Sequence, residues 1–149
     1  MARSPRLAVT VLLAAGMALL LAGAAGIAIG LVNPQLISDQ LPPDAEIDAL
    51  AVGGAAVALG VAIGLVGLIH LATAAALQRG IGIAATAGVV LAATMLMLSF
   101  GFGVAALVSI ASGAASVILM LPASIGLAGA VVAYAAATMA ILRAREAAI

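Results

Sequence analysis

The residue best able to do chemistry in this sequence is His70, the only histidine of the chain and the only ionisable side chain deep inside an apolar segment. Ionisable groups inside a membrane are costly and usually mark functional sites, and histidine titrates near neutral pH. One hypothesis for His70 is therefore a proton- or solute-handling site. The other is structural: a neutral imidazole that hydrogen-bonds a hydroxyl of another helix and fixes how the helices align.

Hydroxyl side chains at a similar depth are the expected partners of His70. Tyr134 and Thr138 stand four residues apart, so they share one face of a helix. Helix rise, counted from the predicted segment ends, puts His70 about 10 Å and Tyr134 about 12 Å inside the same side of the membrane. The sequence predicts a polar layer in the inner leaflet, formed by His70, Tyr134, Thr138, Thr73, Thr86 and Thr10.

The rest of the sequence does not favour catalysis. Cysteine is absent, which excludes thiol catalysis, disulfides and thiolate metal sites. No carboxylate lies deep in a predicted membrane segment, so His70 has no acidic partner for a catalytic triad or a proton relay. One histidine also cannot supply both axial ligands of a bis-histidine haem within a single chain. We expect no catalytic residue, no enzyme activity, no cofactor and no metal.

Acidic residues gather between positions 39 and 48, where they could hold a divalent cation. Asp39, Asp44, Glu46 and Asp48 lack the spacing of a calcium-binding loop. Pro43 followed by Asp44 is instead typical of a helix start, where carboxylates favour the positive end of the helix dipole. We interpret these residues as solvated charges at the start of a helix.

The composition places the chain in a membrane. It is 67% hydrophobic and 7% charged, whereas a soluble domain carries about 25% charged residues. Because so few polar residues cannot cover a water-soluble surface, the bilayer must solvate most of the chain. The net charge is zero, so no basic field attracts nucleic acid. The expected partners are the lipid bilayer and other membrane subunits or a second copy of the chain.

Four apolar segments are long enough to cross a bilayer. We predict helices at 7–32, 46–77, 81–108 and 114–142, a polar extracytoplasmic connection at 33–45, and a tight turn at Gln78-Arg79-Gly80. The first segment and its basic head also fit a secretory signal peptide. Its apolar character continues beyond Ala22-Gly23-Ala24, the candidate cleavage site, which favours a retained helix.

The region from 100 to 122 allows a second interpretation, in which three shorter spans at 81–99, 104–121 and 123–142 replace the last two helices. The arginines favour four helices, because all five then fall on one side, which the positive-inside rule makes cytoplasmic. We predict a multi-pass protein of the cell inner (plasma) membrane with both termini in the cytoplasm. The arginines are Arg3, Arg6, Arg79, Arg143 and Arg145.

Glycines recur at seven-residue spacing in the first two segments. Inside a bilayer the hydrophobic effect does not drive helices together, and close backbone approach at small residues takes its place. We predict an all-α, integral membrane, antiparallel four-helix bundle, one transmembrane domain over 1–149, with small-residue (Gly/Ala) helix packing. The packing glycines are Gly53, Gly60, Gly64 and Gly67 in the second segment and Gly16, Gly23 and Gly30 in the first.

The leading functional hypothesis is a small multi-pass membrane protein that acts without catalysis, as an accessory or assembly subunit or as a self-associating bundle. The alternative is a small permease or channel for protons, ions or an apolar solute, using the inner-leaflet polar layer around His70. A lipid- or quinone-binding role is a third hypothesis, for which the sequence offers no specific residue.

Overall fold

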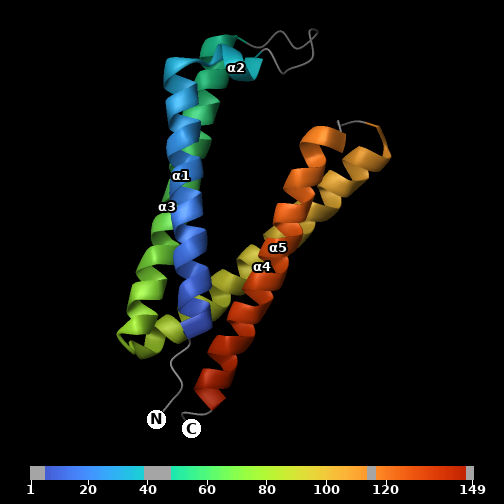
Figure 1. Cartoon of the computed structure of the whole chain (residues 1–149). Coiled ribbons are helices and arrows are strands. Elements are labelled where there is room, and N and C mark those ends of the chain that lie inside the picture. The colour runs from blue at the N-terminus through green and yellow to red at the C-terminus, as the bar shows by residue number, and fades with distance from the viewer. Residues whose placement is uncertain (1–5, 39–47, 114–116, 147–149) are drawn as a thin grey trace. The chain divides into compact units, whose positions relative to one another are not determined.

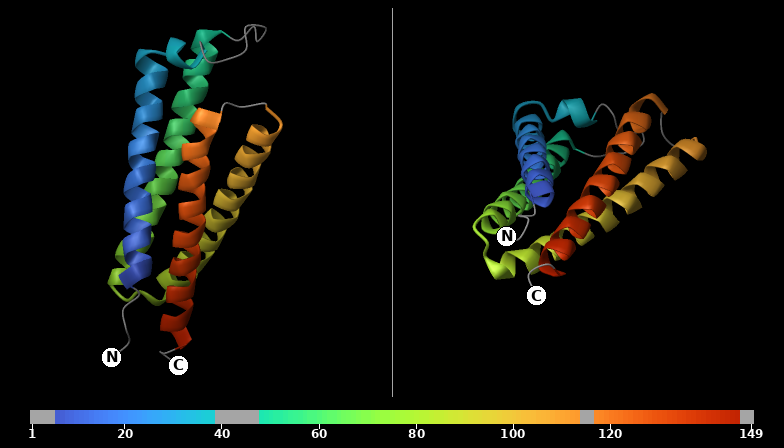
Figure 2. Two further views of the ribbon diagram at one scale, coloured as in Figure 1. Left: turned by 45° about the vertical axis from the view of Figure 1, so that its right-hand side comes forward. Right: turned by 60° about the horizontal axis from the view of Figure 1, so that its bottom comes forward.

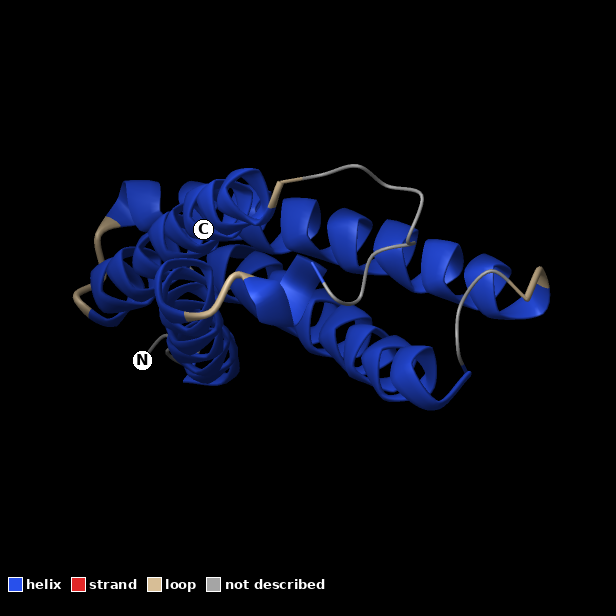
Figure 3. Ribbon diagram, turned by 90° about the horizontal axis from the view of Figure 1, so that it is seen from above, coloured by secondary structure: helices blue, strands red, loops and turns tan. Residues whose placement is uncertain are grey.

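The computed structural model describes residues 6–38, 48–113 and 117–146. Every regular element in these ranges is a helix (Figures 1 and 3). The all-α prediction is therefore confirmed. The helices are α1 (Arg6–Val32), α2 (Gln35–Ser38), α3 (Ala49–Gln78), α4 (Gly82–Ala111) and α5 (Val117–Glu146).

Four of these helices, α1, α3, α4 and α5, are long and apolar enough to cross a membrane. Their 27 to 30 residues correspond to about 40 to 45 Å of helix, against a hydrocarbon core of about 30 Å. By length and composition the chain is a multi-pass membrane protein.

The region that allowed two interpretations holds two long helices. Phe100-Gly101-Phe102-Gly103 lies inside α4, and α5 continues through Pro122. Helix α4 ends at Ala111 instead of 108, and α5 runs to Glu146 instead of 142. Arg143 and Arg145 stand in the last turn of α5, where cations stabilise the negative end of the helix dipole, which explains the longer helix.

The helices belong to two compact units. One, here the α1–α3 unit, comprises Leu13–Ala72, and the other, the α4–α5 unit, comprises Met1–Leu12 and Thr73–Ile149. In the first, α1 and α3 run side by side in opposite directions, and in the second α4 and α5 do the same (Figures 1 and 2). The assembly of both pairs into one bundle and one transmembrane domain stays a prediction.

Glycines with positive φ follow α3 and α4, where the helices end. After α3, the amide of Gly80 donates to the carbonyl of Leu77 and the amide of Ile81 donates to that of Ala76, both at 3.1 Å. Gly80 has φ +71°, so this is a Schellman cap in the predicted tight turn. Gly113 repeats the positive φ, at +73°, just after α4.

Asp48 starts α3. Its carboxylate accepts the backbone amide of Leu50 at 3.2 Å, the bond that an N-cap residue makes. The other acidic residues of the connection, Asp39, Asp44 and Glu46, lie outside the described residues, as do positions 46 and 47 of the predicted helix. The one-turn helix α2 falls within the predicted 33–45 connection and is not part of the sequence-based prediction.

Candidate functional site

A row of facing glycines joins α1 and α3, and we call it the glycine seam. Its three pairs are Gly16–Gly67, Gly23–Gly60 and Gly30–Gly53. A Cβ added at any of the six would come within 2.6 to 3.0 Å of the carbonyl oxygen of its partner. Real Cβ atoms almost never approach another atom this closely, so glycine at these positions permits the close backbone approach of the two helices.

The structure treats Gly64 differently from the other six packing candidates. A Cβ added at Gly64 would meet nothing within 4 Å, and the same holds for Gly54. The backbone of Gly64 nevertheless lies close to α1, because a Cβ added at Gly23 would lie 2.8 Å from the Gly64 nitrogen. Gly60 and Gly64 stand four residues apart on α3, yet a side chain would clash with α1 only at Gly60.

His70 is fully buried, and its Nδ1 lies 2.8 Å from the backbone carbonyl of Val66, one turn earlier in α3. A carbonyl oxygen can only accept, so Nδ1 must carry the proton of this hydrogen bond. In the neutral ring Nε2 then carries the lone pair and acts as the acceptor. The side chain is thus oriented by its own helix, and the tautomer follows from that orientation.

The predicted polar layer is distributed between the two units. His70 lies in the α1–α3 unit, while the five hydroxyl residues lie in the α4–α5 unit, so a hydrogen bond between His70 and one of them stays a prediction. On α5 the structure brings Tyr134 and Thr138 together: the Thr138 hydroxyl donates to the Tyr134 carbonyl at 2.8 Å. Tyr134 is buried, whereas Thr10 and Thr86 are exposed.

Small residues also form the contact between α4 and α5. The buried positions of α4 are Ala84, Gly88, Ala92 and Ser99, which recur at helical spacing. A Cβ at Gly88 would meet Ile141 of α5 at 3.0 Å. The missing side chain of Gly88 therefore leaves room for the side chain of Ile141, which is buried.

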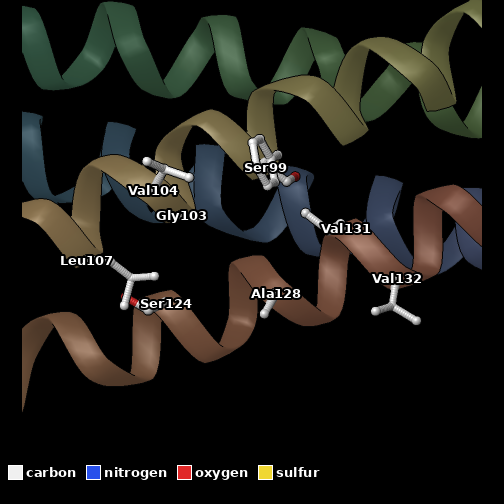
Figure 4. Close-up of a pocket in the computed structure, with 9 residues that line it drawn as sticks. Ser99, Gly103, Val104, Leu107, Ser124, Ala128, Val131 and Val132 are labelled. Carbon is white, nitrogen blue, oxygen red and sulfur yellow. The ribbon is translucent and has the colours of Figure 1, made fainter.

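Farther along the same helix pair, α4 and α5 enclose a partly open groove of about 330 Å³ (Figure 4). Its lining is almost wholly apolar. No residue spacing in the sequence predicts this groove, because it depends on how the two helices pack against each other. Six of the lining residues are Ser99, Gly103 and Leu107 from α4 and Ser124, Ala128 and Val131 from α5.

Among the described residues, no three potential metal-ligating acidic, histidine or cysteine side chains cluster. The built features are the glycine seam, the buried His70 and the apolar groove. No protein-family model matches this chain, and no curated protein and no solved structure matches it with statistical significance.

Proposed function

We propose that this membrane protein acts without catalysis, by associating with other transmembrane segments, either as an accessory subunit of a membrane complex or with copies of itself. The supporting observation is a stripe of exposed small residues on the outer face of α3. These residues recur three or four positions apart, so they lie on one face of the helix. They are Ala51, Gly54, Ala55, Ala58 and Ala62.

Helix α1 carries a comparable exposed stripe. Its members, Ala14, Ala18, Ala22 and Ala25, also follow a spacing of three or four residues. The α1–α3 unit thus has glycines on its inner faces and alanines on its outer faces. In lipid, small residues let two helices approach until their backbones are in contact, which is how membrane helices associate. The glycines are already occupied, and the alanines remain available for another helix.

The permease alternative, in its proton or ion form, gains less support than association from the glycine seam and the groove. The glycine seam has backbone against backbone, and the groove between α4 and α5 is apolar. Transport of protons or ions needs polar groups along a path, whereas association needs small residues on an outer surface. The exposed alanines of α1 and α3 support the association proposal.

The test is a phenylalanine placed on the α3 stripe. In Ala58→Phe, the bulky ring would prevent a second helix from packing closely against the α3 stripe. Leu59→Phe is the control: it places the same ring at the next residue, which is 62% exposed and points about 100° away around the helix. We expect the wild type and Leu59→Phe to enrich the same membrane partner, or to form the same oligomer, in mild detergent. Ala58→Phe should lose it.

Affinity purification with mass spectrometry, combined with chemical crosslinking in native membranes, measures both forms of association. A wild-type protein that is monomeric and enriches no membrane protein would contradict the proposal. So would an Ala58→Phe variant that associates as well as Leu59→Phe at equal expression.

A further inference from the structure

Two hydroxyls line the groove between α4 and α5, those of Ser99 and Ser124, and it is Ser99 that distinguishes the groove from an ordinary lipid-facing surface. Ser99 lines the groove and is only 7% exposed. Other hydroxyls in these helices bond a carbonyl of their own helix one turn back: Ser109 donates to Ala105 at 2.9 Å and Thr138 donates to Tyr134 at 2.8 Å. Within the described ranges, the Ser99 hydroxyl makes no such bond.

The unbonded Ser99 oxygen must reach the groove. Every fully buried side-chain nitrogen or oxygen of the described residues has a hydrogen-bond partner, so an oxygen without one has to border open space. The space that Ser99 lines is the groove (Figure 4). A hydroxyl left without a partner in an apolar environment costs free energy, and a ligand that bonds it recovers that cost.

We propose that this groove binds a lipid-soluble molecule that has an apolar body and a carbonyl oxygen, and that the Ser99 hydroxyl donates a hydrogen bond to that oxygen. A carbonyl fits better than a hydroxyl because it accepts without bringing a donor of its own. The groove supplies Ser99 as its donor in an almost wholly apolar lining.

The depth of Ser99 excludes the ester groups of ordinary bilayer lipids as the source of this oxygen. Ser99 stands 12 residues before the end of α4 at Ala111, about 18 Å along a helix of about 45 Å. It therefore lies near the middle of the span, whereas lipid esters lie at the interface, about 15 Å from the midplane. The ligand must carry its carbonyl into the hydrocarbon core, as a ring carbonyl of an isoprenoid or alkyl quinone does.

The volume of the groove is consistent with a ligand of this kind. At about 330 Å³, it lies at the lower end of the range of small-molecule pockets, roughly 300 to 1,000 Å³. A substituted six-membered ring fits such a space, with the rest of an alkyl tail lying in the bilayer. Bulk lipid chains can contact the same surface but offer Ser99 nothing to bond.

The experiment uses decylubiquinone as the probe and tryptophan fluorescence as the readout. The chain has no tryptophan, so Phe100→Trp creates a single reporter at a residue that lines the groove. Phe102→Trp is the matched control, because Phe102 is similarly exposed (64% against 61%) but is not part of the lining. In nanodiscs, we expect saturable quenching in the Phe100→Trp variant and only linear, partition-driven quenching in the Phe102→Trp variant.

Ser99→Ala in the Phe100→Trp background tests the hydrogen bond. Loss of one neutral hydrogen bond should weaken decylubiquinone binding about two- to tenfold. Ser109→Ala is the control, since that hydroxyl is in the same helix but bonds Ala105 and does not line the groove. The Ser109→Ala variant should leave the decylubiquinone binding curve unchanged. Dodecane, which has no oxygen, should compete only weakly with decylubiquinone for the groove.

Three results would overturn the proposal. They are linear quenching at both reporters, unchanged affinity in Ser99→Ala, and an intermolecular disulfide in native membranes between copies carrying Ala128→Cys, which would make a second copy the occupant. The chain has no native cysteine, so that crosslink is unambiguous. Association through the alanine stripe of α3 is measured separately, so either proposal can fail without the other.

Discussion

At the scale of single residues, His70 illustrates how local geometry selects one state of a side chain. The 2.8 Å contact between its Nδ1 and the Val66 carbonyl joins residues four apart on the same helix. It therefore needs only a helical backbone and a suitable rotamer. The sequence predicts an inward-facing histidine with a hydroxyl partner on another helix, and the carbonyl one turn back is a partner that this prediction does not include.

The tautomer of His70 is the first prediction. We expect Nδ1 to be protonated and Nε2 to be unprotonated in the neutral ring, because the Val66 carbonyl accepts from Nδ1. Nitrogen-15 NMR of histidine-labelled protein in nanodiscs measures this directly, since a chain with one histidine gives one pair of ring signals. Free histidine in the same buffer provides the reference. A ring protonated at Nε2 alone would show that the Val66 bond is not formed.

At the scale of helices, the glycine seam fixes how α1 and α3 pair. Both helices carry three glycines seven residues apart, so a shift of one heptad would still align two pairs. The structure takes the only antiparallel register that aligns all three, with Gly16, Gly23 and Gly30 facing Gly67, Gly60 and Gly53. Helix packing in lipid rewards each close approach, which favours the register with the most pairs.

The second prediction concerns this seam. Gly60→Ala would place a Cβ 2.7 Å from the Gly23 carbonyl and 2.8 Å from the Ile27 amide nitrogen. Both obstacles are backbone, so the helices must separate, and we expect the α1–α3 pair to lose about 1 to 3 kcal/mol. Steric trapping or SDS-induced unfolding in bicelles measures the change.

Gly64→Ala is the matched control for Gly60→Ala. It lies one turn along the same helix, and its Cβ would meet nothing within 4 Å. Alanine also exceeds glycine in helix propensity, so this variant should be neutral or slightly more stable. Equal destabilisation by both variants would mean that the seam does not hold α1 against α3.

At the scale of the whole molecule, the arginines and the helix count together predict an orientation. Four crossings put both termini on one side, and Arg79 lies on that side as well, in the turn between α3 and α4. The positive-inside rule makes this side cytoplasmic. The turn after α4, at Ser112 and Gly113, would then face outward.

The third prediction tests that orientation with single cysteines in a chain that has none. Gln78→Cys and Ser112→Cys each replace an exposed residue beside a turn. A membrane-impermeant maleimide should label the Ser112→Cys variant in intact spheroplasts and the Gln78→Cys variant only after they are permeabilised. Labelling in the reverse order would invert the topology. Labelling of both variants in intact spheroplasts would contradict a membrane crossing by α4, which separates the two positions.

Most of the secondary structure could be predicted from the sequence, and the ends of the helices less well. Apolar runs and proline or glycine breaks place a helix to within a few residues. The end of α4 at Ala111 and that of α5 at Glu146 depend on capping bonds and charges, which compete over one turn. The Phe100 to Gly103 stretch contains two glycines but stays helical, because a single glycine weakens a helix without ending it.

The sequence by itself determined the environment, the number of long helices and which glycines could support close packing. These properties follow from the composition, the hydropathy and the residue spacing of the chain. They can be read without knowing which residues are in contact in the fold. Tertiary structure decided which faces meet. It paired Gly60 with Gly23, left space beside Gly64, and formed a groove between α4 and α5 that Ser99 lines. Such features depend on the distances between helices. All the contacts of a helix pair together set those distances, so the spacing of residues along the chain cannot predict them.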